Sequence, residues 1–510
     1  MRSQRAHQQR ILYLAKHGVA EISMNDSDNT PALQRVNARL AGLWSQLGTQ
    51  FLPFADAVSE RLPLRRLLRL ALFQVSVGMA VVLLTGTLNR VMIVELLVPT
   101  WLVASMISLP LLVAPFRALI GHRSDMHISA LGWRRVPYIW IGTMLQFGGL
   151  AIMPFALLVL SGDTHGPVLY GQIGAGLAFL LVGAGLHTTQ TAGLALATDL
   201  ADDDNRAQVV ALLYVMLLLG MFFSALLFGW LLSDFTQLKL IKVVQGAAAI
   251  TVVLNGIALW KQEARQPQQT RADRERTPFR QAWRALTAQP GAVRLLVTVA
   301  IGSAAFSMQD VLLEPFGGEI LGLSVAQTTL LTALLAGGML LAFMLAAQKL
   351  RQGTDANLLA ALGVMVGIAA FSAVLLADVL QATNLFRIGT LMIGFGSGLF
   401  AVGTLTAAMR LADNMQAGIA LGAWGAVQAT AVGLAVAIGG GLRDLVSSLA
   451  VSGALGPALQ TPSTGYGFVY YLEIVLLFVA LAAIGPLVKY AAVGATRSPQ
   501  AKFGMTEFPN

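Results

Sequence analysis

The sequence predicts an all-α polytopic membrane protein with twelve transmembrane helices in two six-helix halves. Of its 510 residues, 56% are hydrophobic and only 12% are charged, and the mean hydropathy is +0.69. A soluble domain carries about 25% charged residues. Apolar runs of about 20 residues, the length that crosses a bilayer core, recur along the chain. One long polar segment divides these runs into two equal groups.

The apolar runs and the polar segments define the expected organisation of the chain. We place the spans at about 68–89, 97–120, 136–160, 169–198, 207–232, 240–260, 292–313, 325–348, 357–379, 385–409, 417–439 and 467–489. The predicted domains are a cytoplasmic lead with an amphipathic helix, the first half, a flexible cytoplasmic linker, the second half and a cytoplasmic tail, at 1–66, 67–260, 261–291, 292–490 and 491–510.

The distribution of basic residues predicts the orientation of the spans. The chain has 34 Lys and Arg against 25 Asp and Glu, a net charge of +9. Placing both termini and the linker in the cytoplasm leaves outside only Arg90, Lys239, Lys242, Arg387 and Arg443, in agreement with the positive-inside rule. The positive charge is therefore explained by helix orientation, and we expect no nucleic-acid partner.

Several classes of chemistry have no counterpart in the sequence. The chain has no Cys, which excludes disulfides, thiolate metal sites and Cys-based catalysis. It shows no P-loop, no paired catalytic carboxylates and no metal-spaced cluster of His and Asp. We therefore expect neither an enzyme nor a bound metal ion. The basic stretch RLPLRRLLR at 61–69 is expected to attract anionic lipid headgroups, chiefly through Arg65, Arg66 and Arg69.

The two halves contain related motifs. LNRVMIVE at 88–95 closes the first span, and MQDVLLE at 308–314 closes the seventh. Similarly, DLADDDNRAQ follows the fourth span and RLADNMQAG follows the tenth. Parallel six-helix repeats around an axis normal to the membrane are the architecture of the major facilitator superfamily, in which a central cavity lies between the halves.

The loop GHRSDMHISALGWRR between the second and third spans resembles the corresponding loop of that superfamily. Its motif residues are Gly121, Asp125, Gly132, Arg134 and Arg135, with a wider separation of Asp125 and Gly132 than the usual pattern. We expect a cytoplasmic latch, with Asp125 near a helix N-terminus or an Arg. The paired Arg side chains would reach helix carbonyl ends or lipid phosphates.

Three stretches are similar to one branch of the superfamily: TGTLNRVMIVEL, the segment APFRALIGHRSDMHISALGWRRVPYIWIGTMLQFGGLAIMPFAL, and GLHTTQTAGLALATDLA. They resemble the PucC and LhaA family, the bacteriochlorophyll delivery family, over about residues 62–489. The long lead LWSQLGTQFLPFADA looks more like the LhaA branch, which serves the core antenna.

This resemblance implies a membrane assembly factor for the bacteriochlorophyll-binding light-harvesting complexes of purple phototrophic bacteria. Its partners would be bacteriochlorophyll, the enzyme that synthesises it, and the antenna α and β polypeptides. Its place would be the bacterial inner, intracytoplasmic membrane. The sequence leaves open whether the chain forms a homo-oligomer.

His187 is a candidate ligand for bacteriochlorophyll, because a neutral imidazole in a membrane helix can bind the magnesium of a chlorophyll. Gln190 and Thr191 belong to the same polar patch, and Gly183 and Gly185 would leave room for a flat macrocycle. The alternative is a structural histidine that is hydrogen-bonded to Thr188, Gln190 or a neighbouring helix.

Arg90 with Glu95, and Asp310 with Glu314, occupy equivalent positions near the outer ends of the first and seventh spans. They form either a gate or docking site for an antenna polypeptide, or paired caps at the membrane surface. Few acidic residues are expected near mid-membrane, which disfavours a proton-coupled transporter. The alternative function is a secondary transporter of a tetrapyrrole or another amphipathic solute, and a pigment-modifying enzyme is a weaker third candidate.

Overall fold

A computed structural model describes residues 62–112, 133, 135–161, 167–201, 206–263, 284, 287–412 and 417–495, without the side chains of 112, 206–208, 351, 411–422 and 489–495. Within these ranges the elements are all helical, as expected for a chain that must satisfy its backbone hydrogen bonds inside a bilayer. The first half contains α3 (Leu64–Val81), η2 (Val82–Leu88), η3 (Val91–Glu95), α4 (Thr100–Leu112), α6 (Val136–Leu160), α7 (Val168–Leu200), α8 (Arg206–Leu231) and α9 (Gln237–Leu259). The second half contains α11 (Ala292–Ser307), η7 (Met308–Val311), α12 (Leu313–Glu319), α13 (Val325–Arg351), α14 (Ala356–Val379), α15 (Thr383–Ala412), α16 (Ala417–Val451), η8 (Pro457–Leu459) and α17 (Thr464–Ala495).

Eleven helices in the described ranges are long and apolar enough to cross a membrane, so the chain is a multi-pass membrane protein. The expected second span is described only as the shorter helix α4, because residues 113–132 lie outside the described residues. The first span was expected to end near residue 89, yet one continuous helix runs over Leu64–Glu95. The seventh was expected to end near residue 313 and continues to Glu319.

The helix starts carry the residues that cap free backbone N–H groups. Thr236 accepts from the N–H of Lys239 at 3.1 Å at the start of α9. Ser324 and Gln327 form a reciprocal capping box at the start of α13. Asp355 caps α14, and its carboxylate lies 3.7 Å from the Arg410 guanidinium on α15. Burial raises the pKa of Asp355 above its ordinary value, although both the capping N–H and Arg410 favour the charged form.

Each half is built around one glycine-lined helix pair. On α6, a Cβ added to Gly142 would lie 2.4 Å from the Thr189 hydroxyl and 2.8 Å from the Gly185 carbonyl of α7. In the second half, a Cβ on Gly363 of α14 would lie 2.5 Å from the Gly396 carbonyl of α15. Small residues let helix backbones approach this closely. The two pairs occupy equivalent positions in the predicted repeat.

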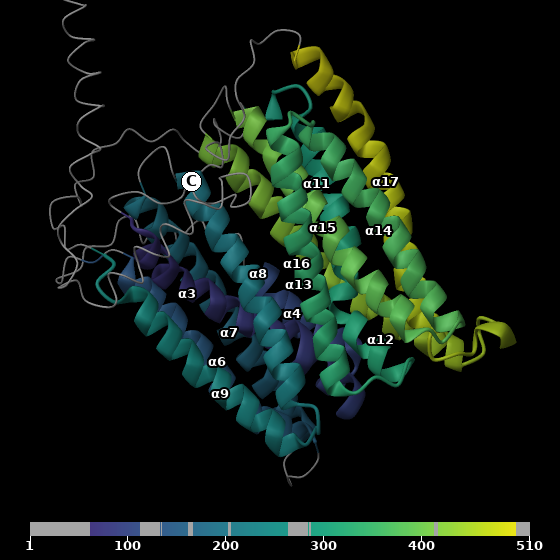
Figure 1. Cartoon of the computed structure of the whole chain (residues 1–510). Coiled ribbons are helices and arrows are strands. Elements are labelled where there is room, and N and C mark those ends of the chain that lie inside the picture. The colour runs from purple at the N-terminus through teal and green to yellow at the C-terminus, as the bar shows by residue number, and fades with distance from the viewer. Residues whose placement is uncertain are drawn as a thin grey trace, which may run out of the picture. The chain divides into compact units, whose positions relative to one another are not determined.

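The halves meet along two further pairs, α4 with α16 and α8 with α13. The repeat exchanges these pairs, because α4 corresponds to α13 and α8 to α16. In Figure 1 the first half runs from purple to teal, the second from green to yellow, and the four pairing helices lie between the outer helices of each half. Described contacts at this interface include Gly440 against Ala104, and Gly229 against Leu330. All four residues lie toward the helix ends that the predicted topology places outside the cytoplasm, here called the outer ends.

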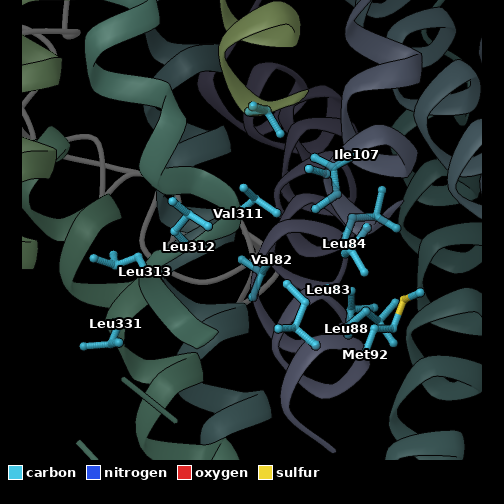
Figure 2. Close-up of a cluster of buried hydrophobic side chains, with 14 of the residues drawn as sticks. Val82, Leu83, Leu84, Leu88, Met92, Ile107, Val311, Leu312, Leu313 and Leu331 are labelled. Atoms are coloured by element: carbon cyan, nitrogen blue, oxygen red, sulfur yellow. The ribbon is translucent and has the colours of Figure 1, made fainter. Parts of the chain in front are cut away.

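A large cluster of buried apolar side chains crosses the interface between the halves. Figure 2 shows Val82, Leu83 and Leu88 of the first helix in one cluster with Val311 and Leu331 of the second half. The first-half residues belong to η2, a stretch of π-helix in which one extra residue per turn widens the helix. The apolar core is therefore continuous from one half to the other, and it includes the stretch where the first span departs from α-helical geometry.

Candidate functional site

Both repeated motifs form irregular helix. In the first span, the π-helical segments η2 and η3 flank Asn89 and Arg90. In the seventh, the 3₁₀ turn η7 over Met308–Val311 joins α11 to α12. Interruptions of this kind at matching positions in the two halves are the usual location of a binding site in transporter folds, and π-helical turns frequently mark functional sites.

Asn89 connects the two irregular segments across the interface. Its side-chain amide nitrogen donates to the Val311 carbonyl at 3.1 Å and to the Thr85 carbonyl of its own helix at 3.0 Å. A second inter-half hydrogen bond joins the hydroxyls of Thr87 and Thr329 at 3.2 Å. The π-helical stretch of one half is thus held directly against the 3₁₀ turn of the other.

Arg90 and Glu95 form an ion pair, as the sequence predicted. Only 4% of Arg90 is exposed, however, so it is a buried residue of the interface and not a cap at the membrane surface. The guanidinium also donates to the Leu323 carbonyl of the second half at 3.2 Å and lies against Gly318. The reason is that the helix continues past residue 89, which carries Arg90 into the packed interior.

Asp310 and Glu314 have different hydrogen-bond partners among the described residues. The Thr332 hydroxyl donates to Glu314 Oε1 at 2.5 Å, and the Gln309 side-chain amide donates to Asp310 Oδ1 at 2.5 Å. Because the helix continues to Glu319, Asp310 lies nine residues, or about 14 Å, inside its outer end. The expectation that these acids lie near the outer surface is therefore wrong for Asp310. Glu314, 4% exposed, is buried against Gly86.

Glu473 on α17 belongs to the same region and was not selected from the sequence. It is fully buried, and its Oε1 accepts from the backbone N–H of Gln309 at 2.7 Å. A signal was present, since Glu473 is a lone acid within the apolar run GFVYYLEIVLLFV, and an ionisable residue in a span is by default a candidate functional residue. Tyr470, one turn earlier, is also fully buried.

Unsatisfied polar atoms gather in this region. Among the described residues, buried side-chain atoms without a hydrogen-bond partner include Asn89 Oδ1, Arg90 Nε, Gln309 Oε1, Glu314 Oε2, the Tyr470 hydroxyl and Glu473 Oε2. Such atoms are uncommon in packed interiors and call for an explanation each time. We call these six residues, with Asp310, the inter-half polar cluster, and take it as the candidate functional site.

The predicted pigment ligands lie elsewhere, on α7. His187, Gln190 and Thr191 are half-buried and share one face of that helix. The expected recess at Gly183 and Gly185 is wrong. A Cβ on Gly183 would lie 2.3 Å from Pro110 of α4, and one on Gly185 would lie 2.5 Å from the Gly142 carbonyl. Both glycines therefore serve helix packing, although the imidazole of His187 keeps the right chemistry for a chlorophyll magnesium.

The motif residues of the loop between the second and third spans are described only in part. Gly121, Asp125, Gly132 and Arg134 lie outside the described residues. Arg135 is buried, and its Nε donates to Asp199 at the end of α7 at 3.0 Å, so its partner is a carboxylate and not only the carbonyls or lipid phosphates expected. Glu263, beyond α9, accepts from the N–H groups of Arg135 and Val136 at the start of α6, at 2.9 to 3.1 Å.

The basic collar before the first span is also partly used within the protein. Arg66 donates to the Gln262 side chain at 3.0 Å and to the Gln262 carbonyl at 2.6 Å. Gln262 returns a hydrogen bond to the Arg66 carbonyl at 3.1 Å. Arg65 is exposed, and Arg69 is half-buried. The three arginines are therefore not equivalent, and Arg65 is the best placed for a lipid headgroup.

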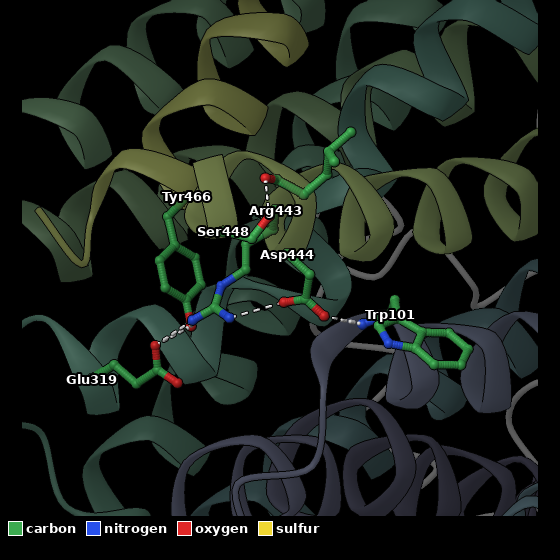
Figure 3. Close-up of polar contacts among 7 residues, drawn as sticks. Trp101, Glu319, Arg443, Asp444, Ser448 and Tyr466 are labelled. Atoms are coloured by element: carbon green, nitrogen blue, oxygen red, sulfur yellow. Dashed lines mark hydrogen bonds and ion pairs between the residues drawn. The ribbon is translucent and has the colours of Figure 1, made fainter. Parts of the chain in front are cut away.

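A polar network also joins the outer ends of the halves (Figure 3). Arg443 on α16 contacts Glu319 at 2.5 Å, the Tyr466 hydroxyl at 3.0 Å and Asp444 at 2.9 Å. Across the interface, Asp444 Oδ2 accepts from the backbone N–H of Trp101, in the first turn of α4, at 2.7 Å. The positive end of the α4 dipole stabilises a carboxylate at this position. Asp444 therefore links α16 to α4. We call this network the outer clamp.

Comparison with known proteins agrees with this architecture. The chain is 16% identical, with a TM-score of 0.64, to a bacterial homologue of the human lysosomal transporter Spinster in an inward-facing, unoccupied conformation, over 86% of this chain and 98% of that one. At that identity the similarity shows the fold alone, that of the major facilitator superfamily.

Sequence relatives are much closer. A Rhodobacter capsulatus protein encoded in the puhA–bchM intergenic region is 58% identical over 91% of this chain and 98% of its own length. Protein PucC of Rhodovulum sulfidophilum is 57% identical over 81% of this chain and 92% of its own length. Residues 87–492 match the family described as PUCC protein. The chain is therefore a member of the PucC family.

Proposed function

We propose that this protein is a membrane assembly factor for the bacteriochlorophyll-binding light-harvesting complexes of purple phototrophic bacteria. It would hold bacteriochlorophyll or deliver it to nascent antenna α and β polypeptides, without catalysing a reaction. The observation that carries the proposal is membership of the PucC family over residues 87–492, with relatives above 50% identity in photosynthetic bacteria. The enzyme that supplies the pigment would be a further partner.

His187 is the residue that we propose as the pigment contact. It lies within α7, and its side chain is half-buried, so it is within the protein yet not fully enclosed. A neutral imidazole nitrogen is a suitable axial ligand for the magnesium of a chlorophyll. Gln190 and Thr191 follow three and four residues later on the same helix face and would offer hydrogen bonds to the ring substituents.

The test is pigment content of the purified full chain. The host is a purple bacterium whose own PucC-family genes are deleted, so that the variant is the sole copy. We expect His187→Leu to keep normal abundance, because Leu suits a membrane helix, while it lowers bound bacteriochlorophyll and slows antenna accumulation. His187→Asn should partly restore both. Thr188→Val is the matched control, since the Thr188 hydroxyl donates only to the Ala184 carbonyl of its own helix in the described contacts.

Two results would contradict the proposal at different levels. If the wild-type protein binds pigment and the His187→Leu variant binds the same amount, His187 is not the pigment ligand. Normal antenna accumulation in the deletion strain without any copy, together with pigment-free purified protein, would refute the assembly function itself.

A secondary transporter of a tetrapyrrole or another amphipathic solute is the second candidate. It is favoured by the matching helix interruptions with buried charged residues between the halves. Liposomes that contain the purified protein and are loaded with a fluorescent tetrapyrrole distinguish the two. Release dependent on the protein supports transport, whereas retention with pigment bound to the protein supports the assembly function.

A further inference from the structure

Gln309 connects two carboxyl groups in the interior of the second half. Its backbone N–H donates to Glu473 Oε1 at 2.7 Å, and its side-chain amide donates to Asp310 Oδ1 at 2.5 Å. Glu473 lies nine residues after the first residue of α17, about 14 Å along the helix, and Asp310 lies about as far inside the outer end of α12. Both residues therefore lie well inside the outer ends of their helices, Glu473 fully buried and Asp310 half-buried.

Among the described residues, no basic side chain bonds to either carboxyl group. Arg90, which the first half contributes to the inter-half polar cluster, is engaged by Glu95 and by the Leu323 carbonyl. Along α17, the titratable neighbours of Glu473 are Tyr470 and, one turn further, Tyr466. The 3₁₀ turn contributes Asp310, a charge of the same sign. From α16, Arg443 is engaged by the carboxylates and hydroxyl of the outer clamp.

The other helices that pack on α17 are apolar at this level. Phe306 of α11 contacts Phe371 of α14, and Phe371 is stacked on Tyr470 with a centroid separation of 6.2 Å. An ionised carboxylate buried without a counter-charge costs several kcal/mol, and a second one nearby increases that cost, whereas a neutral carboxylic acid avoids both.

Two buried acceptor atoms beside the turn lack a hydrogen-bond donor. Glu473 Oε2 and Gln309 Oε1 are acceptors without a donor in the described chain, and the Tyr470 hydroxyl has no partner there either. These side chains are at most 2% exposed. A proton on one carboxyl would supply the missing donor without requiring a cavity.

We propose that Glu473 and Asp310 form a proton-binding site that holds one proton, on Glu473, while the outer ends of the two halves are closed. When the site ionises, one carboxyl O–H bond breaks, the proton passes to water, and two carboxylates are left on either side of Gln309. Their repulsion moves the 3₁₀ turn away from α17. That turn supplies the Val311 carbonyl that receives the hydrogen bond of Asn89, so ionisation loosens the contact between the halves.

The direct test is infrared difference spectroscopy of the purified full-length protein in lipid nanodiscs. We expect wild type at neutral pH to show the C=O stretch of a protonated, non-hydrated carboxyl group, which Glu473→Gln removes and alkaline titration abolishes. Asp310→Asn should shift this band, because it changes the neighbouring group. Exposed Asp234→Asn is the matched control and should leave it unchanged. If wild type has no such band, or if adding NaCl at constant pH abolishes it, the proton assignment is wrong.

The second test measures the coupling to the halves, in the chain's cysteine-free background. Thr100→Cys places a single thiol at a fully buried position beside α16. Its labelling by an impermeant maleimide, corrected for thiolate reactivity with a denatured sample, should rise with pH by at most about tenfold per unit, since one proton is released. Glu473→Gln should make labelling slow and independent of pH. If Glu473→Gln labels with the wild-type pH profile, the coupling is refuted.

Discussion

Asp444→Ala tests whether the outer clamp holds the halves together. The substitution removes the carboxylate that accepts from the backbone N–H of Trp101 at 2.7 Å. Arg443 keeps its contacts with Glu319 and Tyr466. Loss of a helix-capping side chain costs about 0.5–2 kcal/mol, and loss of the favourable charge at the helix start costs about 0.3–1 kcal/mol. We therefore expect the closed arrangement to lose about 1–2 kcal/mol, which raises the open population roughly 5- to 30-fold.

The assay is the labelling rate of Thr100→Cys by an impermeant maleimide at fixed pH in spheroplasts. The rate should rise by the same 5- to 30-fold in Asp444→Ala, because labelling requires the outer ends to separate. Asp444→Asn, which keeps an acceptor oxygen and loses only the charge, should show a smaller increase. Asp234→Ala breaks an exposed pair with Lys239 at 3.4 Å, worth about 0–1 kcal/mol, and should not change the rate. Equal rates in Asp444→Ala and Asp234→Ala would refute the clamp.

Two further substitutions test helix packing and the basic collar. Gly142→Val should abolish folding or sharply lower abundance, because its Cβ would meet the α7 backbone at 2.7 Å, while Gly148→Ala on the same helix has nothing within 4 Å and should be tolerated; similar detergent-extracted yields would contradict the packing argument. Arg66→Gln should lower the melting temperature of the purified protein, since it removes hydrogen bonds worth about 1.5–3 kcal/mol each to Gln262, just after α9. The exposed Arg65→Gln should leave the melting temperature unchanged and weaken binding to anionic vesicles instead, and the opposite pattern would show that the two roles are assigned wrongly.

The sequence by itself determined which segments are membrane helices, because a bilayer imposes a length of about 20 apolar residues and requires each segment to satisfy its own backbone. The third span was expected at 136–160, and α6 occupies Val136–Leu160. The pairing of Arg90 with Glu95 could also be inferred, since the two residues are close in the chain. The motif repeat at residues 88–95 and 308–314 correctly indicated equivalent positions in the two halves.

Only the tertiary structure decided what those positions do. The first span continues to Glu95 through π-helical turns because it is held by the second half, for instance by the hydrogen bond from Asn89 to Val311. The glycines of α7 look alike in the sequence, and their neighbours on α4 and α6 show that they serve packing and not pigment space. Glu473 meets Gln309 over a separation of 164 residues. Local patterns report on a segment's own face and length, whereas these contacts depend on which helices the fold brings together.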